Sequence, residues 1–298
     1  MSQLVVAVLG LGEAGSVIAA DLVAADVDVR GYDPAVAAAE GITDTGSEAE
    51  AVRGADLVLS VNSAQAAVDA FRAGLAGLRD DALWADLNTA SPGTKRRLAA
   101  IAEARGVPFA DVAMMAPVPG RGLRVPMLAS GDGAARFAGT LRPLGAGIEV
   151  LDGPAGLAAR QKLLRSVFYK GMAAAIVEAL EAARAAGVEP WMREHIAAEL
   201  TPADPATVER IVSGTVKHAR RRAAEMEAAA AMLTELGVNP LMASASAAVH
   251  ERLAAAADPP AADPPAADPP AAHPAATDPP QPPTPELRPA GPPLRPGA

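Results

Sequence analysis

The stretch LVVAVLGLGEAGSVIAADL, residues 4–22, decides the fold of this 298-residue chain. An apolar strand at 4–9 runs directly into three glycines spaced G-x-G-x-x-G, and an alanine-rich helix pattern follows at 16–25. The first glycine allows a tight turn, the second lets backbone N–H groups approach a pyrophosphate, and the third lets the helix pack against the strand. The strand–turn–helix context therefore predicts a dinucleotide-binding loop. Its residues are Gly10, Leu11, Gly12, Glu13, Ala14 and Gly15.

A second apolar strand, at 27–32, ends in Asp33, eighteen residues after the last glycine of the loop. A carboxylate at this position accepts hydrogen bonds from both ribose hydroxyls of NAD, whereas the 2′-phosphate of NADP meets like charge there. An aspartate before Pro34 is also a common turn residue, and the two roles are compatible. The sequence thus favours NAD over NADP.

The composition limits the partners and the chemistry. A net charge of −9 argues against a nucleic-acid or anionic-membrane surface as the partner. The absence of cysteine excludes disulfides and thiolate chemistry, and the four histidines lack ligand spacing, so no metal site is predicted. The chain starts with a strand pattern, and no apolar segment reaches membrane-spanning length. We expect a cytoplasmic protein with a small-molecule substrate.

The chain changes its pattern once, near residue 153. Before it, short apolar segments alternate with helical ones, which is typical of a parallel sheet with helices on both faces. After it, a long helix at 155–186 leads into helical segments at 191–200, 204–213, 215–236 and 240–256. We predict a Rossmann-type α/β domain with a doubly wound parallel sheet at 1–153 and an all-helical domain at 154–257. Further strands of the sheet are expected at 56–61, 82–87, 108–113, 125–130 and 148–151.

The strand ends of this sheet predict the cofactor rim, because ligands bind beyond the carboxyl ends of parallel strands. That rule places Val61 and Asn62, then Asn88 and Thr89, and the loop 111–120 around the cofactor. The segment 258–298 repeats DPPAA three times and stays rich in proline. Such a composition forbids helix and supplies no core, so we predict a disordered, extended tail; the alternative is a ligand for a proline-binding module.

The chain resembles the β-hydroxyacid dehydrogenases, the superfamily of 6-phosphogluconate and 3-hydroxyisobutyrate dehydrogenases, over residues 1 to about 255. The resemblance rests on GLGEAGSVIAADL, DLNTASPGTK, DVAMMAPVPGRGLRVPMLASG, KLLRSVFYKG and HARRRAAEME. It is strongest to a branch whose C-terminal domain is phosphogluconate-dehydrogenase-like and has no assigned substrate. The resemblance implies an NAD(P)-dependent oxidoreductase, a homodimer paired through its helical domain, and cofactor contacts from the glycine loop, Val61, Asn62 and Thr89.

The resemblance places the family's catalytic lysine at Lys162. Gly156 keeps the first glycine of the family's G-x-G-x-x-x-K-x-x-x-N pattern, while Ala158 and Ser166 replace its second glycine and its asparagine. Lys162, Ser166 and Lys170 follow one another at helical spacing. A lysine that removes a hydroxyl proton during hydride transfer needs a lowered pKa, from burial or a nearby cation. We expect Lys162 and Ser166 to be catalytic and Lys170 to supply that cation or bind substrate; the alternative is a solvated helix face.

The family's substrate loop, D-A-P-V-S-G-G, has changed in this chain. Counted from Asp111, its serine and two glycines correspond to Met115, Ala116 and Pro117. A donor-rich loop has become apolar and has lost one backbone N–H, which indicates a bulkier or less polar substrate than a small hydroxy acid. The expected substrate contacts are Asn88, Met115, Ala116 and Lys170.

Three functions follow from these features. The first is a dehydrogenase that transfers a hydride between nicotinamide and a hydroxy acid or related alcohol/carbonyl pair, with Lys162 as general acid/base. The second is an imine or iminium reductase, which the apolar loop favours and Lys162 opposes. The third is a non-catalytic dinucleotide-binding sensor or scaffold, which the replacement at Ser166 favours.

Two groups of residues on the helices have a structural interpretation. The basic cluster Arg220–Arg222 fits a solvent-facing stretch balanced by Glu225 and Glu227. The apolar residues Leu164, Phe168 and Ile176 are expected to pack into the helical domain.

Overall fold

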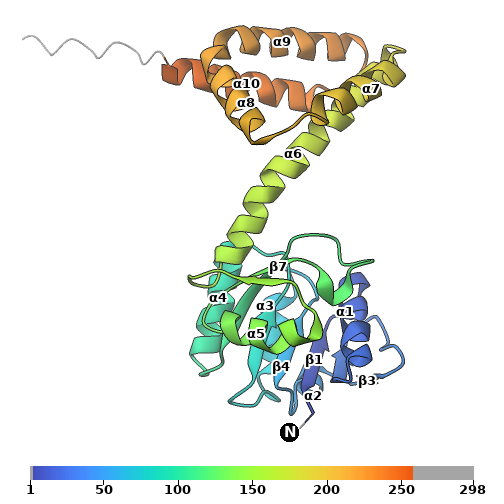
Figure 1. Ribbon diagram of the computed structural model, residues 1–298, viewed down its shortest axis with the longest axis vertical. Coiled ribbons are helices and arrows are strands. Elements are labelled where there is room, and N and C mark those ends of the chain that lie inside the picture. The colour runs from blue at the N-terminus through green and yellow to red at the C-terminus, as the bar shows by residue number, and fades with distance from the viewer. Residues whose placement is uncertain (1–2, 258–298) are drawn as a thin grey trace, which may run out of the picture.

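A computed structural model describes residues 3–257 and consists of a sheet with helices on both faces, a long helix, and a helical bundle (Figure 1). The tail expected at 258–298 lies outside the described residues. The eight strands have the order β3-β2-β1-β4-β5-β6-β7-β8. Their bounds are β1 Val5–Leu9, β2 Asp28–Tyr32, β3 Ile42–Asp44, β4 Leu57–Ser60, β5 Leu83–Asp86, β6 Phe109–Met114, β7 Met127–Ser130 and β8 Ile148–Val150.

Two hydrophobic layers hold helices to the two faces of the sheet. On one face, Ile18 and Leu22 of α1 and Phe137 of α5 pack against alternate strand residues. On the other face, helices α2 to α4 pack over a cluster that includes Phe71 and Trp84. Successive side chains along each strand point to opposite faces of the sheet, so each strand contributes residues to both hydrophobic layers, as expected for a sheet covered on both faces. The helices of this part are α1 Glu13–Ala24, α2 Glu48–Ala51, α3 Ala67–Gly74, α4 Pro92–Glu103 and α5 Ala134–Leu141.

The sheet is parallel from β3 to β6 and then reverses. Strand β7 pairs antiparallel with β6, and β8 runs parallel to β7, so the last two strands oppose the rest. The hairpin between β6 and β7 contains the short 3-10 helix Gly122–Arg124. Because β6 ends at the same edge as β1, β4 and β5, this hairpin brings the predicted substrate loop to the edge where the glycine loop lies.

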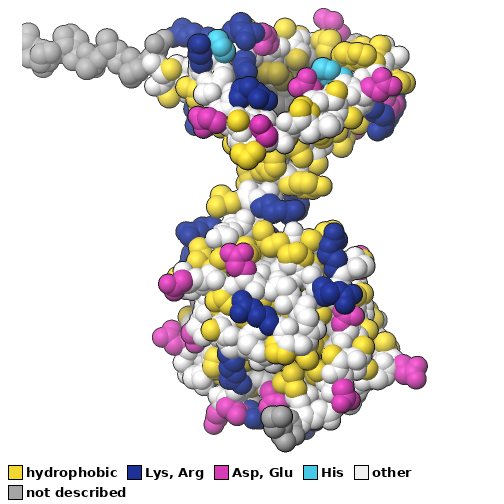
Figure 2. All heavy atoms as spheres, in the orientation of Figure 1, with side chains coloured by type: hydrophobic (Ala, Val, Ile, Leu, Met, Phe, Trp, Pro, Cys, Tyr) yellow, Lys and Arg dark blue, Asp and Glu magenta, His cyan; other side chains and the backbone are white. Residues whose placement is uncertain are grey.

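A single long helix, α6 (Leu157–Ala185), connects the sheet to the helical bundle and forms a narrow neck (Figures 1 and 2). It ends before Gly187, whose φ of +75° suits a glycine at this position. Large apolar side chains of this helix lie in the open: Leu164 is 64% exposed and Phe168 is 69% exposed. The expectation that these side chains pack into their own domain is therefore wrong for Leu164 and Phe168, whereas Ile176 is partly buried.

The bundle consists of α7 (Glu189–Leu200), α8 (Pro205–Lys217), α9 (Ala219–Glu235) and α10 (Leu241–Ala257), beside the end of α6. Ala182, Leu233 and Ala243 form its small core. The buried Glu178 accepts hydrogen bonds from the backbone N–H of Met242 and Ala243, and so satisfies the first turn of α10. Among residues 3–257, no helix combines the length and apolar character needed to cross a membrane.

Candidate functional site

The glycine loop is shaped by close backbone contacts. Gly10 has a φ of +99°, and its N–H donates to the Tyr32 carbonyl at 2.8 Å. A Cβ on Gly15 would lie 1.8 Å from the Gly10 carbonyl oxygen, so α1 packs against the turn only because this residue is glycine. A Cβ on Gly12 would meet nothing within 4 Å. The space beside Gly12 is therefore open at the start of α1, where no described side chain caps the helix.

A cavity of about 520 Å³ lies against this loop. Five of the predicted cofactor residues line it: Gly10, Gly12, Asp33, Val61 and Asn62. Leu11 is buried below, and Glu13, Ala14 and Gly15 form the first turn of α1. Uncapped N–H groups at a helix start bind anions, and the helix dipole adds to this attraction. The loop and its cavity therefore fit a dinucleotide pyrophosphate.

Asp33 is held in place at the wall of the cavity. Its Oδ2 accepts a hydrogen bond from the Leu11 N–H at 2.9 Å, and its Oδ1 accepts from Ala35 N and Val36 N at 2.8 and 3.1 Å. The turn role and the cavity position therefore coexist. Glu48 and Asp69 also line the cavity, which the sequence analysis missed because neither belongs to a motif. Among the described residues that line this cavity there is no Lys or Arg.

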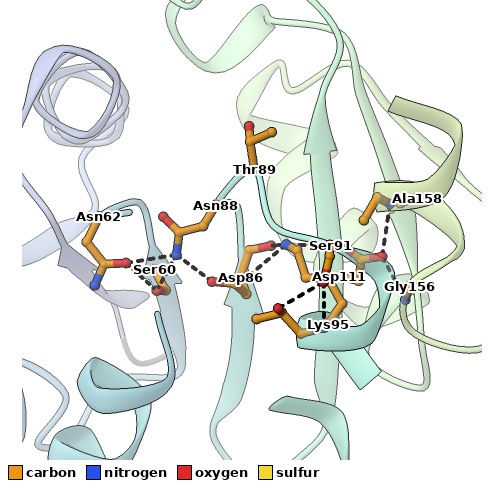
Figure 3. Close-up of polar contacts among 12 residues, drawn as sticks. Ser60, Asn62, Asp86, Asn88, Thr89, Ser91, Lys95, Asp111, Gly156 and Ala158 are labelled. Atoms are coloured by element: carbon orange, nitrogen blue, oxygen red, sulfur yellow. Dashed lines mark hydrogen bonds and ion pairs between the residues drawn. The ribbon is translucent and has the colours of Figure 1, made fainter. Parts of the chain in front are cut away.

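The ends of β4 and β5 carry a polar cluster beside the glycine loop (Figure 3). The Asn88 amide donates to Asn62 Oδ1 at 2.8 Å, to Ser60 Oγ at 3.0 Å and to Asp86 Oδ1 at 2.6 Å. Thr89 follows in the chain and is exposed. Asn62, Asn88 and Thr89 thus meet at one edge of the sheet, as parallel strand ends predict.

Lys162 reaches this edge from the second turn of α6. Its Nζ donates to Thr89 Oγ1 at 2.7 Å, a contact across 73 residues of sequence. Burial, together with the positive charges of Lys95, Lys170 and Arg165, lowers the pKa of Lys162 to about 8. The arrangement gives an amine that exchanges a proton near neutral pH, at the same edge of the sheet as the glycine loop; neither Lys162 nor Thr89 lines the cavity itself.

The two residues expected beside Lys162 lie further along the same helix. Ser166 Oγ donates to the backbone carbonyl of Lys162 at 3.0 Å, so its proton is used within the helix. Lys170 is exposed one turn further on and acts on Lys162 as a nearby positive charge. Within residues 3–257, neither side chain forms a hydrogen bond with the sheet edge.

The substrate loop offers few free donors. The Met115 N–H donates to the Pro126 carbonyl at 2.7 Å, and Pro117 has no N–H. The Met115 side chain packs beside Leu128 and Ala158, while Ala116 packs against the main core. Asp21 of α1 holds the hairpin by accepting the Leu123 N–H at 2.7 Å. The loop therefore presents an apolar surface, fixed to the same helix that begins at the glycine loop.

Sequence reasoning missed a buried charged group behind the Asn88 edge. Lys95 of α4 forms ion pairs with Asp86 and Asp111, and all three side chains are at most 1% exposed. The lysine belongs to the run KRR, which looks like an ordinary solvated helix face. The signal that could have found the group is the pair of aspartates inside two apolar strands, since buried carboxylates need a partner.

Two residues of the basic cluster Arg220–Arg222 make contacts within the helical bundle. Arg221 forms an ion pair with Glu225, and Arg222 donates a hydrogen bond to Thr215.

Comparisons with known proteins agree with this geometry. Residues 5–121 match the family described as the NAD binding domain of 6-phosphogluconate dehydrogenase, and residues 183–253 match a Domain of unknown function (DUF1932). A probable 3-hydroxyisobutyrate dehydrogenase of Mycobacterium tuberculosis is 31% identical over 192 residues, or 61% of this chain. The match spans only 65% of that relative's length. The N-terminal match and the cavity together support a nicotinamide cofactor.

Solved structures share the fold over most of the chain. A conserved hypothetical protein from Sinorhizobium meliloti 1021 is 29% identical, with a TM-score of 0.56, and the match covers 88% of this chain and 92% of that one. An imine reductase from Myxococcus stipitatus, in complex with NADP+, has a TM-score of 0.71 at 17% identity, covering 85% of this chain and 94% of the other. At that identity the second likeness concerns the fold alone.

Proposed function

Because the chain belongs to the β-hydroxyacid dehydrogenase superfamily, we propose that it is a nicotinamide-dependent oxidoreductase acting on an alcohol/carbonyl pair. The observation that carries the proposal is the contact of Lys162 Nζ with Thr89 Oγ1, next to Asn88, whose amide donates to Asn62 at the wall of the glycine-loop cavity. An amine with a pKa of about 8 at that place suits proton transfer to and from a substrate oxygen. The proposed substrate is a hydroxy acid or a related alcohol.

The bound cofactor supplies a hydride acceptor at the nicotinamide C4 during oxidation, and a hydride donor during reduction. In the oxidative direction, neutral Lys162 Nζ accepts the hydroxyl proton while the carbinol C–H leaves as hydride, and the product is a carbonyl. In the reverse direction the ammonium of Lys162 returns that proton to the oxygen. Thr89 Oγ1, which accepts from Nζ in the structure, orients the amine for this exchange. Asn88 lies next to Thr89 in the chain, and its amide is held by Ser60, Asn62 and Asp86.

The pKa of Lys162 decides whether this chemistry works at neutral pH. With a pKa of about 8, about 9% of the amine is neutral at pH 7. At the ordinary lysine pKa of 10.5 only about 0.03% would be neutral. Burial and the neighbouring cations therefore raise the concentration of the base about 300-fold.

The substrate loop favours a less polar substrate than a small hydroxy acid. Met115 has its N–H in a backbone hydrogen bond and Pro117 has none, so two of three loop positions offer no donor to a carboxylate. This observation supports a second candidate, an imine or iminium reductase, whose substrate needs no carboxylate grip. Lys162 then has no hydroxyl proton to accept, which distinguishes the two candidates.

The carboxylates of the cavity support NAD as the cofactor. Asp33, Glu48 and Asp69 all line it, and a 2′-phosphate placed there would face three acidic groups. Three backbone N–H groups occupy Asp33, so one acceptor site, on Oδ2, stays for a ribose hydroxyl. We therefore infer a preference for NADH over NADPH.

The exposed apolar residues of α6 support a homodimer. Leu164, Val167 and Phe168 are each more than 60% exposed, and Figure 2 shows such side chains around the neck. An exposed apolar patch of this kind marks a protein–protein contact. A second copy of the chain, placed against the neck, would cover it. The cytoplasmic location stays a prediction.

Calorimetric titration with NADH, and in parallel NADPH, tests the proposal. We expect micromolar binding of NADH, and equal binding by Lys162→Met, since Lys162 touches no residue of the glycine loop. The two proteins are then screened with NAD+ against hydroxy acids and with NADH against imines. Turnover of a hydroxy acid that Lys162→Met loses, and that the control Lys217→Met keeps, supports the first candidate. Absence of cofactor binding contradicts both candidates, and binding without any turnover supports the sensor.

A further inference from the structure

Lys95 is a fully buried lysine that touches neither the cavity nor the proposed base, and acts on Lys162 in the proposed chemistry only as a nearby positive charge. Its Nζ lies 2.7 Å from Asp86 Oδ2 and 3.2 Å from Asp111 Oδ1, and it donates to the Asp86 carbonyl oxygen at 2.6 Å. Burying three charges is costly, and a buried ion pair by itself adds little stability compared with apolar packing. Such a group calls for a role other than holding the core together.

Lys95, Asp86 and Asp111 form a buried network with two arms, one through each aspartate. The first arm, through Asp86, joins the two ends of the segment that carries Asn88 and Thr89. Asp86 ends β5, and Lys95 lies nine residues later on α4, so the bond from Nζ to the Asp86 carbonyl ties the two ends of the segment. Asp86 Oδ1 also accepts from the Asn88 amide at 2.6 Å. Ser91 caps α4 by accepting the Thr94 N–H. The position of Thr89 thus follows from the position of Lys95 (Figure 3).

The second arm holds the beginning of α6. Asp111 Oδ2 accepts hydrogen bonds from the N–H of Gly156 at 2.8 Å and of Ala159 at 3.1 Å. Ser130 Oγ donates to the same oxygen at 3.2 Å and accepts the Ala158 N–H at 3.1 Å. The first N–H groups of α6, which have no partner within the helix, therefore end on Asp111 and Ser130. Asp111 in turn is oriented by the Lys95 ammonium on its other oxygen.

Both partners of the Lys162–Thr89 hydrogen bond are therefore connected to one buried ammonium. We propose that Lys95 is a positioning residue, which sets Lys162 against Thr89 by holding the 86–95 segment through Asp86 and the start of α6 through Asp111. The use of this network in catalysis rests on the proposed function, whereas the hydrogen bonds and ion pairs that form it do not. Without Lys95, two buried carboxylates would repel each other, and the two arms would separate.

The position of Lys162 can be measured without a substrate. The chain has four lysines, Lys95, Lys162, Lys170 and Lys217, and the buried Lys95 is shielded from reagents. Trace labelling with acetic anhydride at a series of pH values, read by mass spectrometry of peptides, gives the neutral fraction of each exposed amine. Lys170 and Lys217 serve as internal controls. The cations around Lys162 are Lys95 on α4 and Arg165 and Lys170 on α6, and Lys95 is itself paired with the carboxylates of Asp86 and Asp111.

Two variants separate position from charge. Lys95→Met removes the ammonium and leaves both carboxylates. Asp86→Asn combined with Lys95→Met removes one charge of each sign, so the network keeps its net charge of −1. In both variants we expect the labelling midpoint of Lys162 to rise from about 8 by about one pH unit, because Lys162 leaves its half-buried position and burial is the largest cause of its low pKa. In the single variant the lost positive charge of Lys95 adds to this rise, whereas in the double variant the lost carboxylate of Asp86, 2.7 Å from Lys95 Nζ, offsets that charge. The midpoints of Lys170 and Lys217 should not move.

A folded double variant whose Lys162 midpoint stays at about 8 would overturn the proposal. If only the single variant fails to fold, the double variant decides. If neither folds, as judged by circular dichroism, the network determines stability rather than position, and the proposal is wrong as well. NADH titration of the same variants keeps this test apart from the proposed function: absence of cofactor binding in the wild type contradicts the function while the shift at Lys162 still supports the positioning role.

Discussion

The pH dependence of alcohol oxidation follows from the surroundings of Lys162. Burial disfavours the charged amine, and the positive charges of Lys95, Lys170 and Arg165 disfavour it further, so the pKa falls from 10.5 to about 8. Oxidation needs the neutral amine, and activity should therefore rise with pH. The neutral fraction is about 1% at pH 6 and about 90% at pH 9.

The expected profile of kcat/KM for oxidation thus rises about 90-fold between pH 6 and pH 9, with a slope of one decade per pH unit below pH 7. Reduction of the carbonyl needs the ammonium and should fall over the same range. The assay is the change in absorbance of NADH at 340 nm, with a hydroxy acid found by the screen described above.

Lys170→Met gives a matched perturbation of this profile. Removing one of the three neighbouring cations favours the charged form of Lys162, so the midpoint should move to higher pH, by less than the shift that burial causes. Lys217→Met, a change on α8, should leave the profile in place. An oxidation profile that is flat between pH 6 and pH 9 in a folded, cofactor-binding enzyme would refute the assignment of Lys162 as the base.

Three further predictions concern the cofactor cavity and the neck. Asp33→Ser should narrow the ratio of NADPH to NADH dissociation constants by roughly tenfold in calorimetry, and an unchanged ratio would contradict its role in selectivity. Gly15→Val should abolish NADH binding, because even a Cβ would lie 1.8 Å from the Gly10 carbonyl oxygen; titration and a melting curve check this, with Gly139→Ala, whose Cβ meets nothing within 4 Å, as the control. Phe168→Glu should convert a dimer to a monomer in light scattering, whereas a mass unaffected by the charge would show that α6 is not the contact.

The sequence predicts secondary structure and the cofactor loop well where the residues that form them are adjacent in the chain. The strand, turn and helix of residues 4–25 are adjacent, so their order alone determines the glycine loop, and β1 and α1 occur there. Strand β3 and helix α2 span three and four residues, too short for any periodicity to register. The reversal at β7 is not visible in the sequence either, since an apolar run has the same pattern in both directions.

The site shows the same limit for long-range contacts. The resemblance pointed to Lys162, but its hydrogen bond to Thr89 joins residues 73 positions apart, and no spacing rule predicts it. The charged group of Asp86, Lys95 and Asp111 comes from β5, α4 and β6, so no single element contains its pattern. The exposed Phe168 follows the helical spacing of a buried residue, and only the tertiary structure shows that the chain leaves it uncovered.

The length of α6 gives the molecule a mechanical property. At 1.5 Å per residue, its 29 residues span about 44 Å, and the residue before the helix is Gly156, a glycine with a φ of +99°. A tilt of about 5° around that point would displace the far end by roughly 4 Å but Lys162, six residues along, by less than about 1 Å. The Lys162 amine lies close to the end of α6 that is attached to the sheet, so a tilt of the helix moves it far less than it moves the bundle. The bundle at the other end is therefore able to move while the distance between Lys162 and Thr89 is nearly conserved.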